Sequence, residues 1–396
     1  MPFQSGQNIR VVKKRQSGLG VPASGSGGQQ LPLVASGGLR LSKVAIESPE
    51  VRADGMTTIP RHGTRSVTGD LAGVLRVGAL DEWFEDLFRG TWSAPISITQ
   101  AQMTSITTTT NTIVAASGSW ITQGVRVGDI VTLTGHDTAG NNNLRLPVVA
   151  VTASTITVPA NSLTANASAD TSFTLTVLKR LAMGVTERYN TIDEYHADID
   201  QSELATDCKI SSVNLSMQAD GTVVATFGVA GRNLVSQTTG ASPVLTGTAY
   251  DNANLVATDA VVLLDGVRQL TLTGLDLTID MGAQTQGVVG DTLSPDVFSN
   301  NTRVTGTLSA MREDLTWLDR FANETVGSLT LLFRAPGTAP QACHAIHIPH
   351  FTLTESPSAP LGGDGPMISS LSFVAGKAPA ASGVVETMVQ MSSSAA

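Results

Sequence analysis

Apolar and polar residues alternate along much of the chain. In the stretch GLRLSKVAIESPEV the apolar positions include Leu39, Leu41 and Ile46, and the stretch TRSVTGDLAGVLRVG over 64–78 alternates in the same way. A period of two places successive side chains on opposite faces of a strand. We therefore predict a mainly β protein whose strands are buried on one face.

The period changes to that of a helix in the stretch GALDEWFEDLFRGTW. Apolar residues recur there at the i, i+3, i+4, i+7, i+8 spacing of one helical face, and they are Leu80, Trp83, Phe84, Leu87 and Phe88. The opposite face carries the acidic residues Asp81, Glu82, Glu85 and Asp86. Gly90 follows as a plausible stop. We predict a helix that packs its apolar face into the core.

Residues 93–178 differ in character from their surroundings. Short runs rich in Thr, Val and Ile, such as SITTTTNTIVAA and GDIVTLTG, are separated by Gly and Asn turns. This pattern is typical of a small β-barrel or Ig-like sandwich. Trp120 has no aromatic cluster around it in the sequence that would indicate a sugar site. We predict an inserted domain on the exterior, with an unknown ligand.

The second half of the chain repeats the first. Matching segments follow one another in the same order, namely 64–73 with 302–310, 81–92 with 312–325, 173–180 with 329–337, 208–217 with 343–353, and 225–232 with 371–377. Cys208 and Cys343 fall at equivalent points of this alignment. The repeat predicts a duplicated domain, each copy a β-sandwich or barrel with a flanking helix, and the inserted domain interrupts the first copy.

These patterns predict the organisation of the whole chain. The predicted parts are an extended N-terminal arm (1–38), a discontinuous first copy (39–92 and 179–232), the inserted domain (93–178), a linker loop (233–262), a second copy (263–377) and a C-terminal tail (378–396). The arm and the linker are rich in Gly, Ser, Thr or Gln, so we expect them to order on assembly.

Composition narrows the function classes. Hydrophobic residues make up 41% of the chain, which is too many for a disordered protein, and the net charge of −9 argues against a nucleic-acid binder. The basic residues Arg10, Lys13, Lys14 and Arg15 are interpreted as part of a solvated arm. The sequence predicts neither a membrane span nor a secretory signal. Two cysteines are too few for a disulfide framework.

No group of residues has the spacing of an active site. Asp198 and Asp200 lack the loop spacing and the Gly that a Ca²⁺ site with Glu203 requires, and a glycosidase pair has no further support. The histidines of the segment CHAIHIPHF (343–351) are spaced by three, which on a strand sends alternate members to opposite faces. One metal site therefore cannot collect all of them. We predict no enzymatic activity, cofactor or metal.

Three stretches resemble the major tail tube proteins of siphophages, the long-tailed bacteriophages with non-contractile tails. They are RQSGLGVPASGSGGQQLPLVASGGLRLSKVAIESPEVRADG, RHGTRSVTGDLAGVLRVGALDEWFEDLFRGTW and TDCKISSVNLSMQADGTVVATFGVAGR. The resemblance covers most of 8–92, 180–232 and 263–377. It implies a β-sandwich or incomplete barrel flanked by a helix, whose inner sheets join between subunits around a lumen.

The resemblance also implies partners and a location. Rings of the family stack into a tube on a tape-measure protein, between a tail terminator and distal tail or baseplate proteins, and DNA passes through without specific binding. Single-domain relatives form rings of six subunits, so a chain with two copies predicts a pseudo-sixfold trimer. The expected location is the virion tail, after assembly in the host bacterial cytoplasm, with no membrane.

A lumen for DNA should repel phosphates, and acidic side chains do so. The densest acidic stretch contains Asp193, Glu194, Asp198, Asp200, Glu203 and Asp207. A role in the lumen or between rings is one hypothesis for this stretch, and a solvated loop is the other.

Two further functions stay open. A β-sandwich adhesin or capsid decoration protein would be a monomer or compact oligomer, and the tube of a contractile injection system would be surrounded by a sheath.

Overall fold

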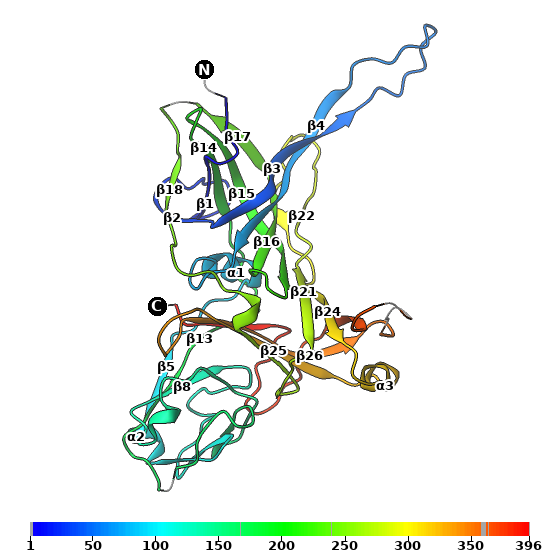
Figure 1. The fold of residues 1–396 in the computed structure, drawn as a ribbon. Helices are drawn as coiled ribbons and strands as arrows, with labels where there is room; N and C mark the ends of the chain where they lie inside the picture. The colour runs from blue at the N-terminus through cyan, green and yellow to red at the C-terminus, as the bar shows by residue number, and fades with distance from the viewer. Residues whose placement is uncertain (1–2, 167, 239, 358–361, 363, 396) are drawn as a thin grey trace.

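The computed structural model describes residues 3–166, 168–238, 240–357, 362 and 364–395. The remaining residues of the predicted domains lie outside the described part of the chain. The fold is mainly β, which confirms the predicted class, and an 18-stranded hydrogen-bonded network runs through both halves of the chain. Figure 1 shows an upper domain in blue and green, a middle domain in yellow to red, and a lower domain in cyan. None of the helices in the described ranges is long and apolar enough to cross a membrane.

The upper domain is the first copy of the repeat. Its elements are β1 (Ile9–Arg15), β2 (Gly25–Gln30), β3 (Leu33–Ile46), β4 (Arg61–Val74), α1 (Asp81–Phe88), β14 (Asn190–His196), β15 (Gln201–Gln218), β16 (Val224–Gly231) and β17 (Asn233–Gln237). The long strand β15 belongs to two sheets, because its first half pairs with β14 and β17 and its second half with β16. The two sheets enclose the core of a β-sandwich.

The middle domain is the second copy. Its elements are β19 (Ala260–Leu264), β20 (Val267–Arg268), β21 (Leu272–Asp280), β24 (Arg303–Met311), α3 (Thr316–Ala322), β25 (Gly327–Arg334), β26 (Cys343–Leu353), β27 (Ile368–Ala375) and β28 (Gln390–Ser393). A small hairpin of β22 (Gln284–Thr285) and β23 (Val297–Phe298) lies between β21 and β24. The connection between the copies contains β18 (Leu245–Thr248) and a 3-10 turn, η2 (Ala257–Asp259).

Strand pairing shows that the two copies share one topology. The pairings of the first copy recur, in the same order, in the second. In the first copy they are β1·β2, β1·β14, β3·β4, β4·β16, β14·β15, β15·β16 and β15·β17. In the second copy they are β19·β20, β19·β25, β21·β24, β24·β27, β25·β26, β26·β27 and β26·β28. All are antiparallel. The helices α1 and α3 occupy the same place in this order, after β4 and β24.

The lower domain is the segment that interrupts the first copy. Its elements are β5 (Ile96–Thr99), α2 (Gln100–Met103), β6 (Ile106–Thr108), β7 (Thr112–Ala115), β8 (Ile130–Thr134), the 3-10 turn η1 (Ala139–Asn141), β9 (Leu146–Pro147), β10 (Ala150–Val151), β11 (Thr155–Thr157) and β12 (Thr174–Val177). They form two four-stranded sheets, β10-β11-β7-β6 and β5-β12-β8-β9, around a separate core that includes Trp120. The strand β13 (Lys179–Ala182) leads back out and pairs with β28.

This interrupting segment docks on the second copy, although it departs from the first. The Asp129 carboxylate accepts hydrogen bonds from Arg180 at 2.9 Å and from Gln390 of β28 at 2.9 Å. A small apolar cluster joins Ile130 and Leu178 to Leu332, Cys343 and Ala345. The outer face of β25, β26 and β28 is therefore covered by this domain.

The ladders correct two details of the sequence alignment. The match of 173–180 with 329–337 is wrong, because β12 pairs within the lower domain and β14 takes the place of β25. The two cysteines are not equivalent either, since Cys208 lies opposite Asn190, at the start of β14, whereas Cys343 lies opposite Arg334, at the end of β25. Short Thr- and Leu-rich strands resemble one another in sequence without sharing a register.

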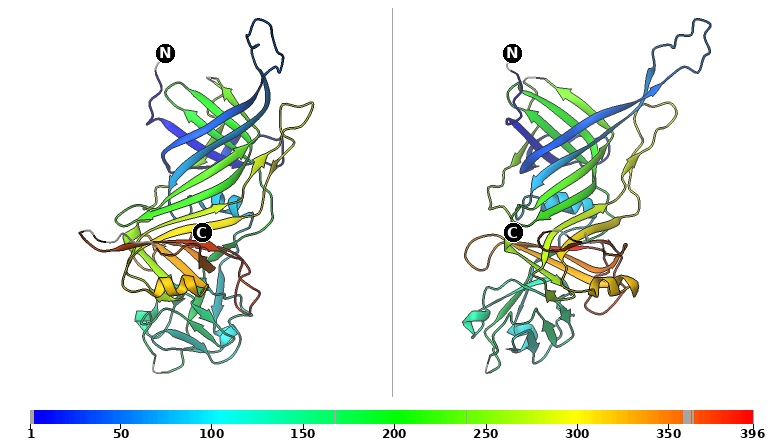
Figure 2. Two further views of the ribbon diagram at one scale, coloured as in Figure 1. Left: turned by 90° about the vertical axis from the view of Figure 1, so that its right-hand side faces the viewer. Right: turned by 45° about the vertical axis from the view of Figure 1, so that its right-hand side comes forward.

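One sheet runs without interruption from the first copy into the second. Its eight strands follow the order β3-β4-β16-β15-β21-β24-β27-β26, and β15 and β21 join the copies through a ladder from Ser212–Asp280 to Gln218–Gly274. Figure 2 shows its blue, green and yellow strands side by side in one twisted surface. Each copy thus contributes four strands to a shared inner sheet.

Three segments predicted as arm, linker and tail contain strands. In the predicted arm, β1 pairs with β14, and β2 pairs with β1. In the predicted linker, β18 pairs in parallel with β2, and β17 and β19 belong to the two copies. In the predicted tail, β28 lies between β26 and β13. Backbone pairing therefore orders parts of all three segments despite their Gly- and Ser-rich composition.

Helix α1 is buried on almost every side. Its apolar residues Trp83 and Phe84 pack on Phe227 of β16, with ring centroids 5.1 and 5.5 Å apart. All five residues of the predicted apolar face lie in the core, and they are Leu80, Trp83, Phe84, Leu87 and Phe88. The acidic face is also covered, since Asp81, Glu85 and Asp86 are buried.

The basic run near the N-terminus neutralises this acidic face. Lys13 is fully buried and forms an ion pair with Asp86, and the Arg15 guanidinium donates to Asp86 and Glu85 at 2.7 Å each. The interpretation of these basic residues as a solvated arm is therefore wrong for Lys13 and Arg15. Burial lowers the pKa of Lys13, and the carboxylate of Asp86 opposes that shift. The pair fixes β1 to the helix.

We predict that Asp86→Ala lowers the free energy of unfolding by about 3–5 kcal/mol, because it leaves Lys13 buried without a counter-charge. Chemical denaturation followed by circular dichroism measures this change. Glu386→Ala is the matched control, since Glu386 pairs with Lys377 on the surface, and we expect it to cost at most about 1 kcal/mol. The double variant K13M/D86L should recover most of the loss. Equal effects of D86A and E386A would contradict the assignment.

Candidate functional site

The inner sheet has one open, polar face. Along β24, Val304 and Leu308 are buried, whereas Thr305, Thr307 and Ser309 lie on the opposite face. Further residues on the open face are Thr68, Asp70, Asn214, Ser216, Thr226, Asp276, Thr278, Asp280, Ser370 and Ser372. Period-two alternation explains this division, since one set of side chains fills the sandwich core and the other meets solvent.

Hydroxyl groups outnumber charges on this face. The acidic side chains are those of Asp70, Asp276 and Asp280, and Arg303 lies directly opposite Asp280 in the ladder. Arg40, beside Thr68 on β3, adds a second cation. The face offers a polar surface with no cluster of positive charge among its described residues.

The β3–β4 hairpin projects well beyond the upper domain, as Figures 1 and 2 show. Its outer part carries the exposed apolar side chains of Val44, Ile46, Val51, Met56 and Ile59. The equivalent connection between β21 and β24 lies against the first copy instead, where Leu293 bridges to Arg65 and Arg232 donates to the Ser294 carbonyl. Exposed apolar side chains on a protruding hairpin indicate a contact surface for another molecule.

A continuous two-domain sheet with an open polar face and a protruding hairpin are features of an assembly protein, and the family comparison agrees. A family model described as "Phage tail tube protein" matches residues 6–375. The chain belongs to the phage tail tube protein family. It is accordingly a structural protein of the virion tail. No curated protein sequence matched the chain significantly.

The acidic stretch, for which a role in the lumen or between rings is one hypothesis, lies in the outer part of the first copy of this tail tube protein. Its residues are carried by β14, by the β14–β15 turn and by the first half of β15, outside the open face of the inner sheet. Asp193, Glu194 and Asp207 are buried, so they do not line an open channel. The Asp193 carboxylate accepts the Leu245 N–H at 2.8 Å, and Asp207 accepts the Gly20 N–H at 2.7 Å. These acids fasten distant segments to the outer sheet.

The other three acidic residues are half-buried near the β14–β15 turn. Asp198 accepts hydrogen bonds from the Ser5 N–H and the Asn8 amide at 2.7 and 2.6 Å. Asp200 accepts the Tyr195 hydroxyl at 3.1 Å. Glu203 lies 4.0 Å from the His196 ring. A role between rings stays a prediction for this turn.

The histidines of β26 point to different sides of the strand. His344 packs on Phe84 of α1, with ring centroids 5.5 Å apart, whereas His347 lies against Gly128 of the lower domain. His347 also shares a hydrogen bond of 2.8 Å with Thr330, and burial lowers its pKa to about 4. The expectation that one metal site cannot collect all three histidines is confirmed. Each of these two is a packing residue at a domain junction.

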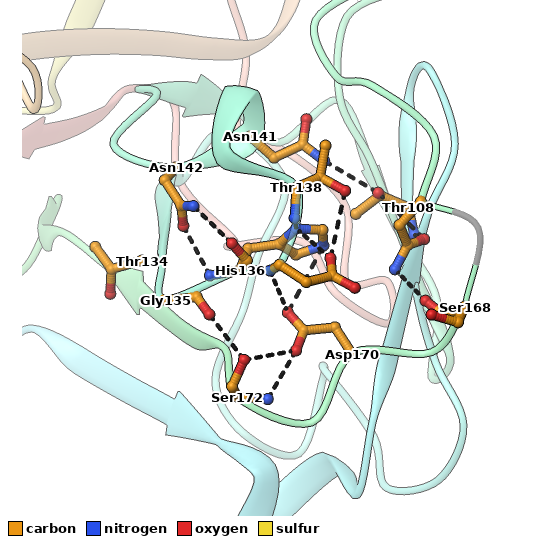
Figure 3. Close-up of polar contacts among 12 residues, drawn as sticks. Thr108, Thr134, Gly135, His136, Thr138, Asn141, Asn142, Ser168, Asp170 and Ser172 are labelled. Atoms are coloured by element: carbon orange, nitrogen blue, oxygen red, sulfur yellow. Dashed lines mark hydrogen bonds and ion pairs between the residues drawn. The ribbon is translucent and has the colours of Figure 1, made fainter.

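Three donor groups gather at a site that sequence reasoning missed, shown in Figure 3. Ligand atoms of His136, Asp137 and Asp170 lie within 4.8 Å of one another. The His136 Nδ1 accepts the Thr138 N–H at 3.0 Å and lies 3.1 Å from the Asp137 carboxylate. The imidazole is thus engaged by its own loop.

The carboxylate of Asp170 is also engaged. It accepts the N–H and hydroxyl of Ser172 at 2.7 and 2.9 Å and the Asp137 N–H at 3.2 Å. Burial acts to raise the pKa of Asp170, but these hydrogen bonds outweigh it and lower the pKa. The group holds a loop of the lower domain in place. No sequence pattern indicates this group, because Asp170 is distant in the chain and only folding brings it to His136.

We predict a pH dependence of stability from Glu194. Its Oε1 accepts the Leu39 N–H at 2.9 Å, and burial, with Glu203 and Asp193 nearby, raises its pKa from 4.5 to about 7. The folded state therefore holds a proton that the unfolded state releases above pH 4.5, so the stabilising contribution is lost as the pH rises through about 7. Glu194→Gln should remove this dependence and stabilise the protein at pH 8 by up to about 3 kcal/mol.

Denaturation midpoints at pH 5 and pH 8 measure this effect, with Glu313→Gln on the surface as the control. Parallel behaviour of E194Q and the wild type across this range would show that Glu194 does not titrate as assigned.

Proposed function

We propose that this chain is the major tail tube subunit of a siphophage-type, non-contractile tail. The observation that carries the proposal is the inner sheet, in which two copies of one domain already pair edge to edge through β15 and β21. In a ring, the same kind of junction would repeat from one domain to the next. The open polar face of the sheet then becomes the wall of the conduit.

The duplication supports a ring of three chains. Among the described strands, β3 pairs only with β4, so one border of the inner sheet is open. Open sheet edges recruit further strands, and closure into a barrel removes them. Two domains per chain would make a pseudo-sixfold ring from three chains. Each chain would consist of an arm, two copies of the domain, the inserted domain, a linker and a tail.

The polarity of the inner sheet suits the passage of DNA. A phosphate backbone binds to clusters of Lys and Arg, and each contact adds salt-dependent friction. The open face instead carries hydroxyl groups with three Asp and two Arg side chains. DNA would slide along this surface during ejection without specific binding. The tape-measure protein would occupy the lumen during assembly in the host cytoplasm, and terminator and distal tail proteins would close the ends.

The position of the inserted domain favours a non-contractile tail over a contractile one. It covers the outer face of β25, β26 and β28, on the opposite side of the second copy from the open face of β21, β24 and β27. A contractile sheath would need that outer surface. We therefore place the inserted domain on the outside of the tube.

We predict that the purified chain assembles into hollow, unsheathed tubes visible by negative-stain electron microscopy. Averaged top views should have threefold symmetry with six inner lobes, and native mass spectrometry of single rings should give the mass of three 41.0 kDa chains. Rings of six chains would overturn the trimer. A protein that stays monomeric at high concentration, without tubes in any condition that nucleates assembly, would overturn the proposed function.

The hairpin should act between rings. We expect the double variant V51D/I59D to form rings that do not stack, because it places charges on the most exposed apolar positions of the β3–β4 hairpin. Electron microscopy distinguishes single rings from tubes. Ala101→Asp, on the exposed surface of α2 in the inserted domain, is the control and should stack normally. Normal tubes from V51D/I59D would remove the hairpin from the stacking contact.

A further inference from the structure

The two helices of the repeat begin alike but end in different surroundings. Both are preceded by a Leu, Leu80 with φ −110° and ψ 6° and Leu315 with φ −100° and ψ 6°. Leu80 is 0% exposed, whereas Leu315 is 54% exposed. Three residues further along, Trp83 is 0% exposed and Leu318 is 40% exposed. The same position in the fold is therefore core in one copy and surface in the other.

The second copy supplies the cover that α1 has and α3 lacks. Phe84 packs on His344 of β26, and the Ser393 hydroxyl of β28 donates to Asp81 at 3.1 Å. Thus α1 fills the end of the next sandwich along the chain. Figure 1 shows α3 at the far side of the second copy, with no domain of this chain beyond it.

Each helix is nevertheless attached to its own copy by an ion pair. The helix supplies the acidic partner of this pair in the first copy and the basic partner in the second. In α1 the fifth residue, Glu85, pairs with Arg15 at the end of β1. In α3 the fifth residue, Arg320, pairs with Asp265, directly after β19. Because β1 and β19 are equivalent strands, both helices are held in the same way on this side. Only the outward side of α3 is left open.

The surface that would cover α3 is also open, at the matching end of the first copy. The ladders place Glu203 and Ser236 of β15 and β17 where Ile346 and Met391 lie in β26 and β28, because Ala205 and Ile348 stand at the same bulge. Ile346 and Met391 are buried in the core.

The same two positions are open in the first copy. Ile346 and Met391 belong to the buried core, but Ser236 is exposed and the Glu203 side chain is 46% exposed. Both halves of one interface are thus uncovered in the single chain, while the equivalent halves cover each other inside it.

We propose that α3 docks into the β15–β17 end of the first copy of a second molecule of this chain. This inference rests on the proposed ring and names its contact between chains. The contact repeats the one that α1 makes with β26 and β28, so a single packing geometry serves every junction of the ring. Asp319 stands where α1 has Phe84, so the contact between chains is less apolar than the one within a chain. Weaker contacts between chains suit subunits that stay soluble until assembly is nucleated.

The double variant L315D/L318D tests this contact. We expect it to fold, with the circular dichroism spectrum and unfolding midpoint of the wild type, because both side chains are solvent-exposed in the single chain. Its ring formation should fall at least tenfold in sedimentation velocity experiments, since charges would be buried at the interface. Ala101→Asp is again the control and should form rings normally. Wild-type amounts of rings from L315D/L318D would overturn the inference and leave the tube proposal intact.

A cross-linking experiment does not depend on the folding of that variant. Leu318→Cys and Ser236→Cys, made in separate chains and mixed before assembly, should give a disulfide-linked dimer in oxidised rings, and neither variant should do so alone. The native Cys208 and Cys343 are buried and should not compete. Rings that form from the mixture without the cross-linked dimer would overturn the contact. Wild-type protein that forms no rings would refute the proposed function itself.

Discussion

Helix α1 joins the two copies because one of its faces is aromatic and the other is acidic, and both faces are buried. Its aromatic residues pack on Phe227 in the first copy and on His344 in the second. Its carboxylates lie buried against Lys13, Arg15 and Lys179. Burying charges without partners would cost several kcal/mol for each group, so the helix can occupy this junction only if β1 and β13 are in place. The relative placement of the copies is thus set by this helix together with the β15–β21 ladder.

The inner sheet links that packing to function. Each copy adds four strands, and the long strand β15 lets the first copy belong to an outer and an inner sheet at once. Backbone hydrogen bonds between β15 and β21 do not depend on the side chains, so they do not determine which copy lies next in the sheet. Side chains on the helices provide that information, because they decide which sandwich end can cover which helix. Gene duplication within one chain would then let the two kinds of junction differ, one permanent and one formed during assembly.

The inserted domain packs on the outer face of β25, β26 and β28, which the inner sheet leaves free. It leaves the first copy after α1 and returns through β13, which becomes a partner of β28. Its anchor on the second copy is partly polar, through Asp129 with Arg180 and Gln390. Burial raises the pKa of Asp129 to about 6, although Arg180 opposes the shift. The domain therefore belongs to the junction between the copies and does not hang from a flexible linker.

Sequence patterning by itself determined the mainly β class, the helix over 80–88 and the repeat, because period-two and period-3.6 alternation are local properties of the chain. The family followed from the resemblance of three stretches to tail tube proteins. It also indicated that the histidines of β26 face different ways. Only the tertiary structure decided that Lys13 is a buried counter-ion, that Glu194 and its acidic neighbours fasten segments together, and that β14, and not 173–180, matches β25. Those outcomes depend on which distant groups meet, and charges or short strands of similar composition do not encode their partners locally. The His136–Asp170 contact and the unequal cover of α1 and α3 have the same origin, since both arise from neighbours that are far away in the chain.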